Sequence, residues 1–107
     1  MRESLYGEIT LFSTAMAVTI YLSGHLKSYT CGETEISLDS DFDAVSEVLD
    51  SLWQLHPALR DRILNEQGEI RQHVNIFDGD RDVKRSGGLE TPVDSSEIHI
   101  FNAVSGG

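Results

Sequence analysis

With 107 residues, the chain has room for one domain built on one hydrophobic core. Its 18 acidic and 8 basic residues give a formal net charge of −10, which disfavours nucleic acids and anionic membrane surfaces because both attract lysine and arginine. The single cysteine, Cys31, excludes an intrachain disulfide, and no apolar run approaches the ~18 residues of a membrane span. We therefore expect a cytoplasmic protein.

Two strands are predicted first along the chain. Val18, Ile20 and Leu22 share one face of an alternating pattern, and residues 35–38 alternate in the same way. A period of two is typical of strands with one buried side. Residues 23–34 contain glycine and small polar residues, so the two strands are predicted to form an antiparallel hairpin.

The period changes after residue 40 to that of an amphipathic helix. Ser40 or Asp41 is expected to cap its N-terminus, Asp43 to lie in its first turn, and Pro57 to end it. Residues 58–64 are predicted to form a short turn or helical piece that closes the core. The apolar stripe of the helix consists of Val45, Val48, Leu49, Leu52 and Trp53.

The last third of the chain returns to strand patterns. Residues 74–77 are predicted as a strand, Asp78 and Gly79 as a hairpin turn, and residues 82–84 as a short return strand. A final strand over residues 97–101 places Ile98 and Ile100 toward the core.

This order of elements predicts an α+β fold. One main helix can cover one side of a mixed sheet of four to five strands, and the final strand can lie centrally in it. The arrangement is a ubiquitin-like β-grasp, which we assign to residues 16–102. Residues 1–15 have a weaker pattern, and we expect them to be a disordered extension or to precede a true start at Met16, with an added edge strand as the alternative.

The chain ends in Ala103-Val104-Ser105-Gly106-Gly107, predicted as a flexible tail. Glycine has no Cβ, so a Gly-Gly end can enter a channel that excludes other residues. Fully extended, these five residues span about 17 Å. The pattern indicates that the Gly107 carboxylate is a working group that enters another protein's active site, although glycines also occur in frayed ends without a role.

Phe101 is a candidate docking residue. It points away from the face that carries Ile98 and Ile100, and Phe77 is expected nearby on a paired strand. The two rings are predicted to form an exposed apolar patch that docks a partner. The alternative is that Phe101 packs beneath residues 1–15 or a loop.

No metal site is predicted. The 4 histidines lie in different predicted elements and lack the spacing of metal ligands. Asp78, Asp80 and Asp82 alternate, but no glutamate follows at the position that a calcium loop requires. We expect these carboxylates to be solvated in the hairpin.

From residue 16 onward the chain resembles the MoaD/ThiS-like sulfur carriers, and CysO-type members most of all. The resemblance is carried by His73 to Phe77, by Asp82-Val83-Lys84, by Ser86-Gly87-Gly88-Leu89, and by the block from Glu97 to Gly107. Asn102 stands where the family usually has proline, so the exit of the tail is expected to be less rigid. Gly106 and Gly107 match the family's pattern.

The resemblance implies a carrier rather than an enzyme. An ATP-dependent activating enzyme would adenylate Gly107, and a sulfur donor would convert it to a thiocarboxylate for a sulfur-accepting synthase. The chain has no phosphate-binding loop, so we expect it to bind no cofactor itself and ATP to be used by the activating partner. Conjugation of Gly107 to lysines as a protein modifier, and a non-covalent binding module, remain alternatives.

Overall fold

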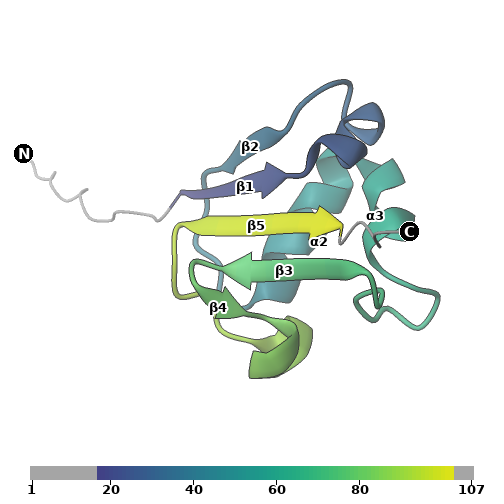
Figure 1. Cartoon of the computed structure of the whole chain (residues 1–107). Helices are drawn as coiled ribbons and strands as arrows, with labels where there is room; N and C mark the ends of the chain where they lie inside the picture. Colours follow the sequence, from purple (N-terminus) through teal and green to yellow (C-terminus); the bar gives the residue numbers. More distant parts are fainter. Residues whose placement is uncertain (1–16, 103–107) are drawn as a thin grey trace, which may run out of the picture.

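The computed structural model describes residues 17–102 and builds one mixed sheet over one main helix (Figure 1). The predictions for residues 1–15 and 103–107 lie outside the described residues. Within the described range the strands are β1 (Val18–Leu22), β2 (Glu35–Leu38), β3 (Val74–Asp78), β4 (Arg81–Asp82) and β5 (Glu97–Asn102), and the helices are α2 (Val45–Leu55) and α3 (Arg60–Ile63). Short 3₁₀ turns cover Gly24–Tyr29, Pro57–Leu59, Lys84–Ser86 and Gly88–Glu90.

The last strand lies in the middle of the sheet, as predicted. The order is β2-β1-β5-β3-β4, and β5 runs parallel to β1 and antiparallel to β3. Ile20 pairs with Ile98, and Ile76 pairs with Ile100. β1 pairs with β5 from Glu97 to Ile100 and β3 pairs with it from Ile98 to Asn102, so the last residue of this central strand is held by β3 through Val74.

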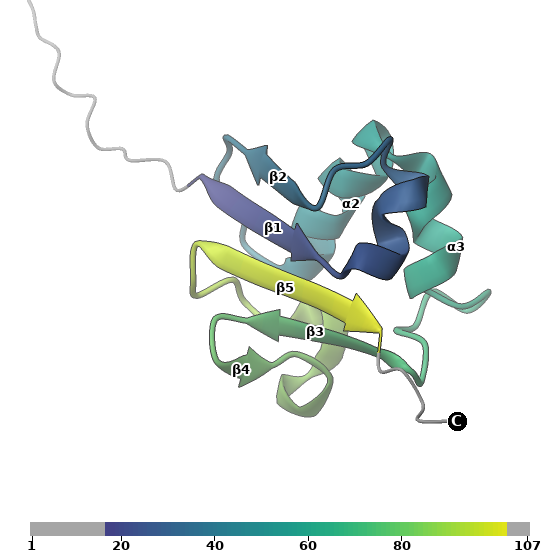
Figure 2. The same ribbon diagram turned by 45° about the horizontal axis from the view of Figure 1, so that its top comes forward.

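Helix α2 packs across one face of the sheet (Figure 2). The predicted stripe is confirmed, since its four aliphatic side chains are buried and Trp53 packs half-buried against them. The turn and short helix after Pro57 bury Leu59 and Ile63, also as predicted. Leu26 in the first 3₁₀ turn adds a core residue that the sequence pattern did not reveal. None of the helices among residues 17–102 is long and apolar enough to cross a membrane.

The start of α2 differs from the prediction. Its N-cap is Ala44 rather than Ser40 or Asp41, and no side chain caps it. Ala44 stays extended because it forms a β-bridge with Pro92, and the Val45 N–H donates to the Thr91 carbonyl at 2.9 Å. A tertiary contact therefore satisfies a backbone donor that a polar cap would otherwise satisfy.

The hairpin after β3 also differs from the prediction. The return strand β4 is Arg81–Asp82 instead of residues 82–84, with Gly79 and Asp80 between the paired residues. Val83 turns into the core and is fully buried. Its N–H still donates to the Ile76 carbonyl of β3 at 2.9 Å, and a 3₁₀ turn over Lys84–Ser86 follows.

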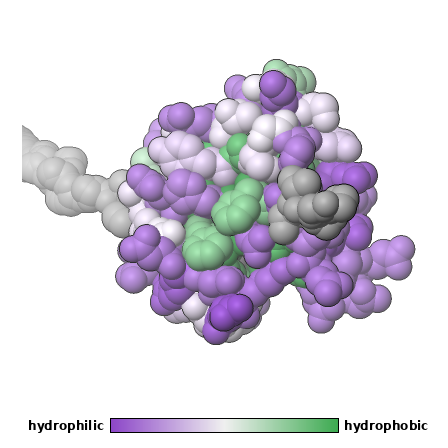
Figure 3. Space-filling model, in the orientation of Figure 1, coloured by the Kyte–Doolittle hydropathy of each residue, from purple (hydrophilic) through white to green (hydrophobic). Residues whose placement is uncertain are grey.

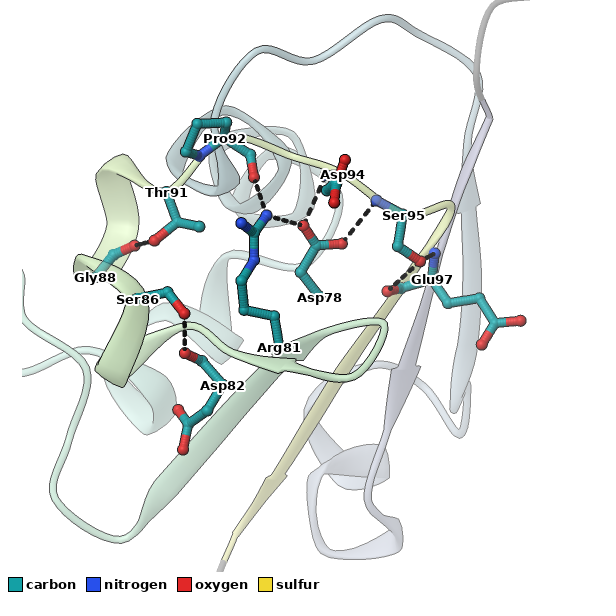
Figure 4. A network of polar contacts seen from close by, with 10 residues as sticks. All are labelled: Asp78, Arg81, Asp82, Ser86, Gly88, Thr91, Pro92, Asp94, Ser95 and Glu97. Carbon is teal, nitrogen blue, oxygen red and sulfur yellow. Dashed lines mark hydrogen bonds and ion pairs between the residues drawn. The ribbon is translucent and has the colours of Figure 1, made fainter.

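Asp78 is buried rather than solvated, which corrects the expectation for the hairpin carboxylates. Its Oδ2 accepts from the Asp94 N–H at 2.7 Å and its Oδ1 from the Ser95 N–H at 3.0 Å (Figure 4). Arg81 Nη2 lies 3.3 Å from Asp78 Oδ2 and also donates to the Pro92 carbonyl at 2.8 Å. One carboxylate thus ties the β3–β4 turn to the segment that leads into β5.

Candidate functional site

Four ring side chains gather on the face of the sheet opposite α2. We call Tyr21, Phe77, His99 and Phe101 the aromatic patch; they come from the three adjacent strands β1, β3 and β5. His99 pairs in register with both Tyr21 and Phe77. Figure 3 views this face and shows a hydrophobic area in its middle with hydrophilic residues around it.

The rings of the patch stack in two pairs. Tyr21 and His99 have centroids 4.8 Å apart with planes inclined by 15°, and Phe77 and Phe101 have centroids 5.8 Å apart with planes inclined by 13°. Such pairs hold the side chains in fixed positions without covering their outer faces.

The predicted placement of Phe101 and Phe77 is confirmed, and their docking role stays a prediction. Phe101 is 38% exposed, which is unusual for a phenylalanine. The stack with Phe77 explains why the ring lies against the sheet instead of extending into solvent.

Tyr21 is a patch residue that sequence analysis missed. It alternates with Ile20 and Leu22, which places it on the outer face, but only the pairing of β1 with β5 brings it beside His99. His99 lies on the outer face, as expected from its alternation with Phe101. Its Nε2 is also 3.2 Å from Glu97 Oε1.

A shallow depression of about 200 Å³ lies next to the patch at the end of β5. Tyr21, His99 and Phe101 line it together with Ser23, whose buried hydroxyl oxygen has no hydrogen-bond partner among the described residues. The depression lies just before Asn102, the last described residue. The aromatic patch therefore adjoins the point where residues 103–107 continue from the sheet. The candidate tail residues Ala103, Val104, Ser105, Gly106 and Gly107 lie outside the described range.

We find no candidate metal centre among residues 17–102. No group of three or more histidine, cysteine, aspartate or glutamate side chains is placed there to hold a metal ion. Cys31 is exposed in the loop between β1 and β2.

Sequence comparison identifies the family. No family model matches the chain. The sulfur carrier protein CysO of Mycobacterium tuberculosis is 30% identical over 95 residues, which cover 86% of this chain and all of CysO. The chain belongs to the MoaD/ThiS-like family of ubiquitin-fold sulfur carriers.

Solved structures agree with the β-grasp fold of this sulfur carrier. The CysO of the Amycolatopsis orientalis BexX/CysO complex superposes with a TM-score of 0.73 at 32% identity, covering 85% of this chain and all of that one. A member of the family with this fold thus forms a complex with another protein. The sulfur carrier is a small carrier protein and not an enzyme, as predicted.

The sulfur carrier is also similar to a protein modifier. Small archaeal modifier protein 1 of Haloferax volcanii is 34% identical over 77 residues, which cover 71% of this chain and 85% of the modifier. The family resemblance seen in the sequence is confirmed by these matches.

Proposed function

We propose that Gly107 carries the sulfur. An ATP-dependent activating enzyme adenylates its carboxylate with release of pyrophosphate, and sulfide supplied by a sulfur donor then displaces AMP to leave a terminal thiocarboxylate. A carboxylate is a poor electrophile until one oxygen becomes part of a good leaving group, which is the role of AMP. The thiocarboxylate is a soft sulfur nucleophile that a sulfur-accepting synthase uses in biosynthesis of cysteine, molybdopterin, thiazole or a related compound.

The observation that carries this proposal is the similarity to CysO along the whole length of that sulfur carrier. The position of β5 supports it, because a central strand delivers the following residues from a rigid base. The chain itself holds no cofactor in this scheme, and ATP belongs to the activating partner. We place both reactions in the cytoplasm, with neither nucleic acid nor membrane as a partner, in keeping with the net charge of −10.

The aromatic patch is the proposed docking surface for these partners. Phe101 and Phe77 supply apolar area, and because Phe101 directly precedes Asn102, a partner can bind the patch and receive residues 103–107 at once. Exposed apolar patches rimmed by polar residues are typical of protein interaction sites.

Mass spectrometry of protein isolated from its native host tests the sulfur-carrier function. Under sulfur demand we expect a fraction of the protein to have one terminal oxygen replaced by sulfur. A variant lacking Gly107 is the control and should show no such fraction. If the full chain carries only the plain carboxylate under sulfur demand, the proposal is wrong.

The similarity to small archaeal modifier protein 1 favours a second candidate function. After the same activation, Gly107 would be joined to lysines of target proteins. Denaturing gels probed for the chain would then show conjugates of high mass that disappear when Gly107 is deleted. Conjugates without any thiocarboxylate would favour the modifier over the carrier.

A further inference from the structure

A polar cleft of about 280 Å³ opens on the other side of the end of β5 from the aromatic patch. Asn102 contributes one wall, since it follows the inward alternation of Ile98 and Ile100. Asp61 and Arg62 of α3 and the segment with Arg71 and His73 complete the lining. We call this the basic cleft.

Two guanidinium groups in the basic cleft are held in place by neighbouring groups. Arg62 lies with its Cζ 5.2 Å from the centroid of the Tyr29 ring. Arg71 donates from Nε to the Asp61 carbonyl oxygen at 2.9 Å. No described residue accepts a hydrogen bond from its two terminal amino groups. The cleft thus presents positioned donors to an incoming group.

The surroundings of the basic cleft carry positive charge, whereas the chain as a whole carries a net negative charge. Arg60, Arg62 and Arg71 are three of the 8 basic residues in a chain of net charge −10. The acidic member of the lining, Asp61, has its carboxylate 3.5 Å from Arg60 Nη1. Glu69 is turned into its own loop, where its Oε1 accepts from Asn65 at 3.3 Å. A local surplus of positive charge therefore remains beside the exit of the tail.

We propose that the basic cleft binds aspartate and glutamate side chains at the mouth of the activating enzyme's tail-binding channel. Arginine forks fit carboxylates with two parallel hydrogen bonds. The inference rests on the proposed function, because the channel is that of the enzyme that adenylates Gly107.

The length of the tail separates this ligand from the nucleotide. Residues 103–107 extend at most about 17 Å from Asn102 to the reacting carboxylate. An extended tail places the nucleotide phosphates at its far end, roughly that distance from the cleft. The enzyme's residues at the entrance of the channel, by contrast, lie near Asn102 and therefore beside the cleft. The anion that the cleft meets is therefore a protein carboxylate instead of a phosphate of ATP.

The cleft and the aromatic patch together fix how the carrier docks. They lie on opposite sides of the end of β5, so a partner that contacts both prevents rotation of the domain about the tail. The net charge of −10 adds to this orientation, because an acidic channel mouth repels the acidic parts of the surface.

Kinetics of the activating enzyme from the same host test the cleft. ATP–pyrophosphate exchange is measured with the wild-type carrier, Arg62→Glu and Arg85→Glu. Arg85 is the matched control, since its side chain is 88% exposed and the substitution changes the net charge equally. For Arg62→Glu we expect the KM for the carrier to rise about five-fold at low salt with kcat unchanged. The difference in KM between Arg62→Glu and the wild-type carrier should shrink as the salt concentration rises from about 0.05 to about 0.5 M.

The outcomes separate the two proposals. Equal KM values for Arg62→Glu and Arg85→Glu, with wild-type exchange intact, overturn the basic cleft and leave the proposed function standing. No exchange with the wild-type carrier overturns the proposed function, and the cleft's role with it. Arg71→Gln is the second variant, should circular dichroism show that Arg62→Glu fails to fold; it should raise KM in the same salt-dependent way.

Discussion

Replacing Asp78 by asparagine keeps the size of the side chain but turns one of its two acceptor oxygens into a donor. In the native domain both oxygens accept from backbone, at 2.7 Å from the Asp94 N–H and 3.0 Å from the Ser95 N–H, and Arg81 lies 3.3 Å away. Whichever way the amide is turned, its NH₂ group faces a backbone N–H that then has no acceptor. The substitution therefore breaks the link between the β3–β4 turn and the start of β5.

The expected loss of stability follows from those contacts. The Asp78 side chain is fully buried, so an N–H left without an acceptor costs about 1–3 kcal/mol, and the remaining bonds lose the contribution of the negative charge. We expect the free energy of unfolding to fall by about 2–4 kcal/mol. Small domains have only about 5–15 kcal/mol in total, so the melting temperature should fall by at least about 8 °C.

Urea denaturation followed by the fluorescence of Trp53, the single tryptophan, measures this loss. Asp80→Asn is the matched control, because Asp80 is exposed in the same hairpin and its substitution removes the same charge. We expect the control to change stability by less than about 0.5 kcal/mol. Equal effects of the two substitutions would refute the structural role of Asp78.

Three further substitutions test the fold around β5. Gly79→Ala should cost about 1 kcal/mol more than Gly68→Ala, because both have positive φ but only at Gly79 would a Cβ lie 3.1 Å from the Ser95 side chain; chemical denaturation of both variants measures the difference. Ile100→Ala should lower the free energy of unfolding by about 2–5 kcal/mol, since the side chain is fully buried in the central strand, and a near-neutral effect in thermal unfolding would contradict the assigned core. Phe101→Ala should cost only about 1 kcal/mol, because the ring is 38% exposed and loses mainly its stack, so a loss as large as that of Ile100→Ala would count against a surface role.

The order of the elements could be predicted because it follows from local burial patterns. Residues such as Ile20, Ile36 and Ile98 alternate with polar or outward-facing neighbours. A strand with this pattern buries its apolar face against the core. The stripe of α2 is as clear, and Pro57 marks its end in the sequence. Phe101 was found for the same reason, since its position on the outer face follows from alternation alone.

The features that could not be predicted depend on contacts between distant segments. An aspartate before glycine is typical of an exposed turn, and nothing near Asp78 in the sequence indicates that Asp94 and Ser95 supply its donors. The helix begins at Val45 because Thr91 accepts from its N–H. The stack of Tyr21 on His99 likewise needs the parallel pairing of β1 and β5, which the alternation of either strand leaves open.

The central position of β5 has a consequence for any protein that acts on Gly107. In the proposed function an activating enzyme and a sulfur acceptor each receive the same tail, so the two cannot bind the carrier together. Each must also contact the domain near the end of β5, because the tail reaches at most about 17 Å from Asn102. The aromatic patch and the basic cleft are the surfaces that adjoin this point among the described residues. Apolar contact suits a patch shared by both partners, whereas the charge of the cleft can distinguish them, since only a partner with acidic residues at its channel mouth gains from the arginines.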